Sequence, residues 1–162
     1  VVGVHWGVEN SHAIADPQRT LAQNLADWGA DLIIGTHPHV LQNAQWLTAA
    51  DGRQVFTAYS LGNFISTQEK PDQLVGAILS VQLEKTTKPD GTVRCSVLSP
   101  RLLPTVTHYD AGKSNVRTYL FRDYTEALTK AHGVRQAYPD FSLEMIQSIA
   151  RKNIDPEFLQ LT

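Results

Sequence analysis

The sequence predicts an α/β fold in which a strand, a helix and a second strand are followed by antiparallel strands and two C-terminal helices. Three observations predict this class. Apolar, β-branched runs alternate with one amphipathic segment early in the chain, strand-like runs joined by turn residues fill the middle, and polar stretches with helical spacing fill the end. With 162 residues, the chain is long enough to bury the core of one ordinary domain.

The first elements form a βαβ pattern. Residues 1–6, VVGVHW, are an apolar, β-branched run that ends before Gly7, which predicts a buried strand. A helix is predicted over residues 16–28, because Asp16 offers an N-cap and Pro17 suits the first helical position. Its apolar positions are Leu21, Leu25 and Trp28.

The second strand is predicted at residues 31–35, DLIIG, and is followed by a loop at 36–45, THPHVLQNAQ. Pro38 argues against sheet pairing inside that loop, because proline cannot donate to the ladder. The middle of the chain then predicts antiparallel strands at 54–64, 76–85 and 93–107, with a hairpin turn at 88–92. Two helices are predicted at 116–133 and 142–153.

Three histidines follow the ends of the two neighbouring strands: His5, His37 and His39. Open α/β sheets place their ligands at these carboxyl ends, so we expect the imidazoles to converge. Converging neutral imidazoles are typical ligands of zinc, manganese and iron. The spacing of His37 and His39 leaves open whether they reach one ion or two. Gly35 and Gly62 permit close backbone approach at the neighbouring strand ends.

Other chemistry-bearing residues have simpler interpretations. We expect three histidines at the surface or as hydrogen-bonded, partly buried residues, namely His12, His108 and His132. We expect the tryptophans to serve packing, namely Trp6, Trp28 and Trp46. Glu9 is open to three interpretations: a general base, a partner that orients a histidine, or a solvated loop charge.

Composition excludes several classes of protein. The formal net charge of -2 lacks the basic excess that is typical of nucleic-acid binding, so we expect no nucleic-acid partner. Cys95 is the single cysteine, which excludes an internal disulfide and a cysteine-rich zinc site. No apolar run approaches the roughly 20 residues that a membrane-spanning helix needs.

Three motifs, VHWGVE, ADLIIGTHPHVLQ and YSLGNF, occur in this order and together cover residues 5–64. This combination resembles the C-terminal half of the poly-gamma-glutamate capsule synthesis protein CapA family, which itself resembles the calcineurin-like metallophosphoesterases. The resemblance implies a mixed-sheet α/β sandwich flanked by helices, of metallophosphoesterase type, whose N-terminal half is absent. It divides the chain into residues 1–108, the C-terminal half of that domain, and residues 109–162, a helical extension.

The same resemblance implies roles for individual residues. HWG corresponds to the strand-end histidine of the metallophosphoesterase site, and GTHPH corresponds to its G-H-x-H element. His5, His37 and His39 are therefore implied as ligands of one or two divalent ions, with Mn, Zn, Fe or Mg as candidates. We expect His39 and Glu9 as catalytic residues, with either His12 or Glu9 as the residue that approaches the leaving group. Asn63 of the SLGNF motif is expected to form a hydrogen bond near the site rather than to bind metal.

The chain departs from the family in two ways. It begins without Met and lacks the half that brings further metal-site residues in relatives, so we expect it to be part of a longer protein. Asn10 and Gln45 stand where relatives often carry a tyrosine and an acidic residue, so substrate contacts do not transfer directly.

Three hypotheses for function follow from these residues. The first is a metal-dependent, phosphoesterase-like hydrolase of capsule polymer synthesis, which acts on a phosphoester or an anionic polymer. The second is a non-catalytic cell-surface factor that binds the polymer or assembles with the membrane proteins of capsule export. The third is a structural module that pairs with a missing N-terminal half or with a second copy of itself. In bacteria this context is the cell surface, with any membrane anchor outside this chain.

Overall fold

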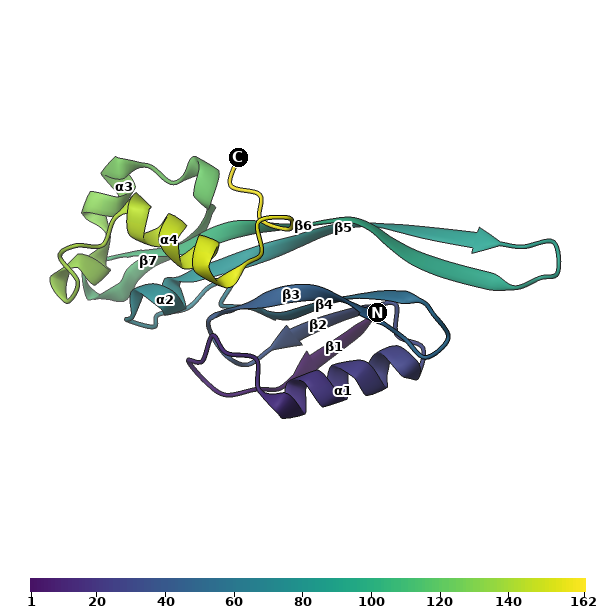
Figure 1. Ribbon diagram of the computed structural model, residues 1–162. Coiled ribbons are helices and arrows are strands. Elements are labelled where there is room, and N and C mark those ends of the chain that lie inside the picture. The colour runs from purple at the N-terminus through teal and green to yellow at the C-terminus, as the bar shows by residue number, and fades with distance from the viewer.

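Two β-sheets build the protein, and the computed structural model describes all residues from 1 to 162 (Figure 1). Sheet A contains, in spatial order, β1 (Val2–His5), β2 (Leu32–Thr36), β4 (Gln54–Leu61) and β3 (Leu41–Thr48). Sheet B contains β5 (Val75–Thr87), β6 (Val93–Asp110) and β7 (Ser114–Leu120). The helices are α1 (Asp16–Asp27), α2 (Pro71–Leu74), α3 (Glu126–Ala131) and α4 (Leu143–Asn153).

The arrangement confirms the α/β class. Helix α1 lies along one face of sheet A, and α3 and α4 gather at one end of sheet B (Figure 1). The far ends of β5 and β6 extend away from these helices as a two-stranded arm (Figure 1). A mixed sheet, an antiparallel sheet and flanking helices are consistent with part of a metallophosphoesterase-like fold. None of the helices is both long and apolar enough to cross a lipid bilayer.

The predicted βαβ unit is confirmed. Strand β1 pairs with β2 in parallel, and β2 pairs with β4 in parallel, so three strands end at the same edge of sheet A. Helix α1 begins at Asp16, and Ala15 rather than Asp16 is its N-cap. The Gln18 side chain supplies the cap contact, because its Oε1 accepts a hydrogen bond from the Ala15 N–H at 3.0 Å.

The packing expected of Trp28 is wrong. Its side chain is 74% exposed, because α1 ends at Asp27 and Trp28 follows the last turn. The buried residues of α1 are Gln18, Ala22 and Ala26. The two alanines let the helix lie close to the sheet, and Leu21 and Leu25 are only partly buried beside them.

The predicted loop at 36–45 is too long. Only residues 37–40 are irregular, and β3 begins at Leu41. Strand β3 pairs with β4 antiparallel, from Leu41 opposite Leu61 to Thr48 opposite Gln54. Pro38 interrupts the sheet, but its influence ends before the buried pair of Leu41 and Gln42.

The predicted helix at 116–133 is also wrong. Residues 114–120 form β7 because they pair antiparallel with β6, with His108 opposite Arg117 and Thr105 opposite Leu120. Tertiary pairing with an available sheet edge therefore overrides the local helical spacing. The helical part shrinks to α3, which is capped by Thr125, whereas α4 begins after Ser142 as expected.

The larger hydrophobic core lies between the two sheets and α4. Most of its members come from sheet A, sheet B and α4, and they include Leu41, Phe56, Val75, Leu102, Val106 and Ile146. A smaller core lies between α1 and sheet A, and includes Ala22, Ala26, Ile33, Val55 and Tyr59. The predicted domain boundary at residue 108 falls inside β6 and stays a prediction.

Candidate metal centre

The three strand-end histidines lie together at one edge of sheet A. His5 is the last residue of β1 and pairs with Thr36, the last residue of β2, so His37 follows immediately beside it. The ring centroids of His5 and His37 are 4.4 Å apart, and those of His37 and His39 are 6.0 Å apart. Parallel pairing of the two strands thus brings these side chains to one place.

Glu9 joins this group from the loop after β1. The ligand atoms of Glu9, His37 and His39 all lie within 4.8 Å of one another. The two histidines are half-buried and the carboxylate is exposed, so a small solute can approach the set from solvent. His5 lies beside His37 but is not a member of this closest set. Two imidazoles and a carboxylate are a typical ligand combination for Zn²⁺, Mn²⁺ or Fe²⁺.

The backbone of the two loops is unusual. His37 has a φ of 100°, His39 has a φ of 61°, and Asn10 has a φ of 61°. Non-glycine residues seldom adopt this left-handed region, and such residues cluster at binding sites. The Asn10 N–H donates to the Pro38 carbonyl oxygen at 2.8 Å and joins the two loops directly.

Close packing behind the histidines supports this edge of the sheet. The indole N–H of Trp6 donates to the Tyr59 carbonyl oxygen at 2.8 Å. A Cβ atom on Gly35 would lie 2.0 Å from that oxygen and 2.3 Å from the indole nitrogen. Glycine is therefore required at this position, as its place at a strand end suggested, and Trp6 serves packing as expected.

Asn63 contacts the group through His39. The Nδ1–H of His39 donates to the Asn63 Oδ1 at 2.9 Å, and the Asn63 Nδ2 donates to the His39 carbonyl oxygen at 3.1 Å. This assignment follows from the Asn63 amide, whose nitrogen faces carbonyl acceptors. With Nδ1 protonated, the Nε2 atom of His39 keeps its lone pair for a ligand.

The remaining histidines lie elsewhere. The Nδ1–H of His12 donates to the Leu41 carbonyl oxygen at 2.7 Å, and its Nε2 lies 3.9 Å from Asp72. His108 and His132 are buried under the C-terminal helices with their rings 4.8 Å apart. Burial lowers the pKa of His108, and it lowers the pKa of His132 to about 4. These three residues match the hydrogen-bonded role expected of them.

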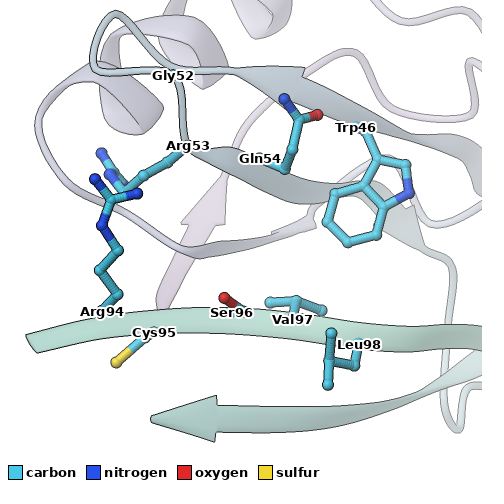
Figure 2. A pocket seen from close by; sticks show the side chains of 9 residues that line it. All are labelled: Trp46, Gly52, Arg53, Gln54, Arg94, Cys95, Ser96, Val97 and Leu98. Atoms are coloured by element: carbon cyan, nitrogen blue, oxygen red, sulfur yellow. The ribbon is translucent and has the colours of Figure 1, made fainter. Parts of the chain in front are cut away.

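A separate hollow of about 490 Å³ lies at the opposite end of sheet A, between the β3–β4 turn and the arm of β6 (Figure 2). Arg53 and Arg94 line one side of this hollow, and Trp46 lines the other side (Figure 2). The guanidinium of Arg53 is already occupied, because it donates to Asp51 at 2.6 Å and to the Ala30 and Ala26 carbonyl oxygens at 2.8 Å. We therefore assign this hollow no chemistry.

The sequence analysis did not identify the buried glutamines near Glu9, His37 and His39. Gln42 donates to the carbonyl oxygens of Ser11 and Ala13 at 2.9 Å and so holds the loop after β1. Gln73 lies in the four-residue helix α2, contacts Asn10, and receives a hydrogen bond from Asn63. Gln42 is the last residue of the motif ADLIIGTHPHVLQ, although the motif assigns it no role. Gln73 lies outside every motif.

The fold and this side-chain group define an α/β protein with a candidate metal centre at its parallel strand ends. Residues 1–68 match the family model described as bacterial capsule synthesis protein PGA_cap. The chain is 39% identical over 97 residues to the PGA biosynthesis protein CapA of Bacillus subtilis (strain 168), which covers 60% of this chain and 23% of the relative. It is 43% identical over 68 residues to the capsule biosynthesis protein CapA of Bacillus anthracis, which covers 42% of this chain and 15% of the relative.

Residues 1–68 are thus similar to the bacterial capsule synthesis protein family, and both relatives are CapA proteins. The match contains the complete group of Glu9, His37 and His39 together with His5 and Asn63. The aligned part spans less than a quarter of the length of either relative.

Proposed function

We propose that this chain forms part of a metal-dependent, phosphoesterase-like hydrolase in bacterial capsule or poly-gamma-glutamate synthesis. The observation that carries the proposal is the convergence of Glu9, His37 and His39, whose ligand atoms lie within 4.8 Å of one another. The relatives named for capsule and PGA biosynthesis support the biological context. The proposal extends to the bacterial cell surface as its place of action and to membrane proteins of capsule synthesis as partners.

The donor atoms fit a divalent cation. Glu9, His37 and His39 would hold it, and His5 lies close enough to His37 to belong to the same centre. Two imidazoles favour Zn²⁺, Mn²⁺ or Fe²⁺ over Mg²⁺, which prefers oxygen ligands. A bound cation of this kind supplies a Lewis acid and lowers the pKa of a coordinated water toward 7.

The residues of the chain prepare the site for that chemistry. His39 directs its Nε2 outward because Asn63 holds its Nδ1–H. Glu9 is exposed and lies on a loop held by Asn10, so its carboxylate meets solvent and substrate first. Phosphoesters and polyglutamate are both anions, and a bound divalent cation would attract either.

Hydrolysis of a chromogenic phosphoester by the metal-loaded, full-length protein tests this proposal. We expect turnover that His39→Ala reduces by roughly 100-fold or more, because it removes one ligand of the group. His12→Asn is the matched control, since His12 lies outside the group and asparagine can still donate to Leu41. Absence of any turnover that depends on His39 would overturn the hydrolase. Polymer binding that survives the loss of His39 would then favour a non-catalytic binding factor.

A further inference from the structure

We infer that Gln73 is a positioning residue that holds both ligand-bearing loops of the candidate metal centre in place before a cation binds. The inference rests on the proposed metal-dependent function. Gln73 lies in α2, immediately before β5, and therefore outside the segment that matches the family model. It touches none of the candidate ligands. Its side chain acts through Asn10, whereas its main-chain carbonyl oxygen contacts Asn63.

Gln73 is buried and fully engaged. Its side chain is only 8% exposed, although glutamine usually lies at the surface. The Nε2 atom donates to Asn10 Oδ1, and the Oε1 atom accepts from the Lys70 N–H at 3.2 Å. Its main-chain carbonyl oxygen accepts a hydrogen bond from Asn63 Nδ2 at 3.0 Å. The buried side-chain amide fixes the position of its partners, because a buried polar group left without a partner is destabilising.

One branch of this network reaches His39. Asn63 donates through Nδ2 toward Gln73, His39 and Gln68, at distances of 3.0, 3.1 and 2.6 Å. Those acceptors fix the orientation of the amide, so the Oδ1 atom faces the His39 ring. The main-chain carbonyl of Gln73 therefore helps to fix the imidazole tautomer whose Nε2 is free, and this branch is independent of the Gln73 side chain.

The other branch reaches Glu9 through its neighbour. Asn10 receives the Gln73 hydrogen bond on its side chain, and its N–H donates to Pro38 between the two histidines. The loop of Glu9 and the loop of His37 and His39 are thus held to each other and to α2. Ordering a loop costs conformational entropy, so a network that orders both loops in advance raises metal affinity.

Calorimetric titration of the full chain with Zn²⁺ alone tests the inference. Gln73→Leu removes both side-chain hydrogen bonds while retaining similar bulk in a buried position. We expect it to weaken Zn²⁺ binding by roughly 10-fold to 100-fold, the range found for partners that orient metal ligands. Gln82→Leu, an exposed change on β5, is the matched control and should leave binding unchanged.

A double-mutant cycle distinguishes positioning from general loosening. Asn10→Gly removes the same hydrogen bond from its exposed end and tolerates the φ of 61° at this position, so the double variant with Gln73→Leu should bind Zn²⁺ no more weakly than Gln73→Leu alone. Additive losses would overturn the shared network. If Gln73→Leu fails to fold, Asn10→Gly alone must still weaken binding for the inference to stand.

The failure of this inference and that of the proposed function give different results. Zn²⁺ binding that is equal in the wild type and in Gln73→Leu overturns the positioning role and leaves the metal centre intact. A wild type that binds no more Zn²⁺ than His37→Ala overturns the metal centre itself. In that case, amide hydrogen exchange of residues 9–12 and 37–40 in the metal-free chain tests whether Gln73 orders the two loops. Gln73→Leu should accelerate exchange in both. Unchanged exchange would refute the network.

Discussion

His37 and His39 lie half-buried at the end of a parallel strand, whereas His108 and His132 lie 4% and 2% exposed between sheet B and the C-terminal helices. In the second pair, the protein itself satisfies the ring nitrogens. His132 donates from Nε2 to the Thr107 carbonyl oxygen at 3.0 Å and accepts at Nδ1 from the Val134 N–H at 2.9 Å. His108 contacts the Tyr124 hydroxyl at 2.7 Å and Asp110 at 3.4 Å.

The two pairs use the same side chain for opposite purposes. In the buried pair, both nitrogens of His132 are occupied, so the ring acts as a neutral structural link. At the strand ends, Asn63 occupies one nitrogen of His39 and leaves the other for a ligand. The environment of each ring, rather than the number of histidines, therefore distinguishes a buried, hydrogen-bonded pair from a candidate metal centre.

The largest expected effect concerns the backbone beneath the strand-end histidines. Gly35→Ala should destabilise the protein by about 3 kcal/mol, because the new Cβ would collide with the Tyr59 carbonyl oxygen and displace the Trp6 indole. Urea unfolding monitored by Trp fluorescence measures this loss. Gly3→Ala in the neighbouring strand is the matched control, since nothing lies within 4 Å of its Cβ position.

Gly35→Ala also tests whether the strand ends of sheet A open independently of the region around His108 and His132. Amide hydrogen exchange should accelerate most around β1 and β2, while the amides around His108 and His132 stay protected. Equal stability of Gly35→Ala and Gly3→Ala would contradict the tight approach of β2 to Tyr59.

The second effect concerns the pH dependence of stability that arises from the buried pair of His108 and His132. The pKa of His132 is lowered to about 4, chiefly by burial and also by the nearby His108, while Thr107 and Asp110 oppose the shift. The unfolded chain takes up this proton near pH 6.5, so it binds more protons than the folded chain between pH 6.5 and about 4. Stability therefore falls as pH drops through this window, by about 2 kcal/mol between pH 7 and 4.5 from His132 alone.

Urea unfolding at pH 7 and pH 4.5 measures that dependence. His132→Gln should lose stability at pH 7, because its two hydrogen bonds are not reproduced, but it should lose less on acidification than the wild type. Lys130→Gln, an exposed change in α3, controls for altered surface charge. An acid response in His132→Gln as large as in the wild type would assign the effect to other groups.

The sequence predicted the parts of this molecule that depend on local pattern. The βαβ unit follows from residues 1–35, and the hairpin between β5 and β6 follows from its turn at 88–92. The convergence of His5, His37 and His39 follows from parallel strand ends, which need no knowledge of side-chain contacts. Asn63 was expected to form a hydrogen bond at the site and does so.

The remaining features depend on tertiary contacts that no local pattern encodes. Strand β7 forms because β6 offers an edge, although residues 114–120 belong to a stretch with helical spacing. Trp28 is exposed because α1 ends one residue earlier than its apolar stripe. Gln73 joins the candidate metal centre from a segment 34 positions after His39, and only the packing of α2 brings it there.

The smallest expected effect concerns the N-cap of α4, and it tests whether the C-terminal helices influence the strand-end histidines. Ser142 caps α4, since its hydroxyl oxygen accepts a hydrogen bond from the Met145 N–H at 3.2 Å. Ser142→Ala should cost about 1 kcal/mol of stability in urea unfolding, the usual loss for a helix N-cap. Ser148→Ala, inside the same helix, should be neutral or slightly stabilising because alanine has the higher helix propensity.

Ser142→Ala should nevertheless leave Zn²⁺ affinity within about twofold of the wild type, because losing a cap frays one helix end without moving α2. Calorimetric titration of the same variants measures this. A tenfold loss of affinity in Ser142→Ala, with Ser148→Ala unchanged, would mean that α4 transmits its order to Gln73 through α2. The C-terminal helices would then help to hold the strand-end histidines in place. The two histidine pairs would be distant from each other but energetically coupled.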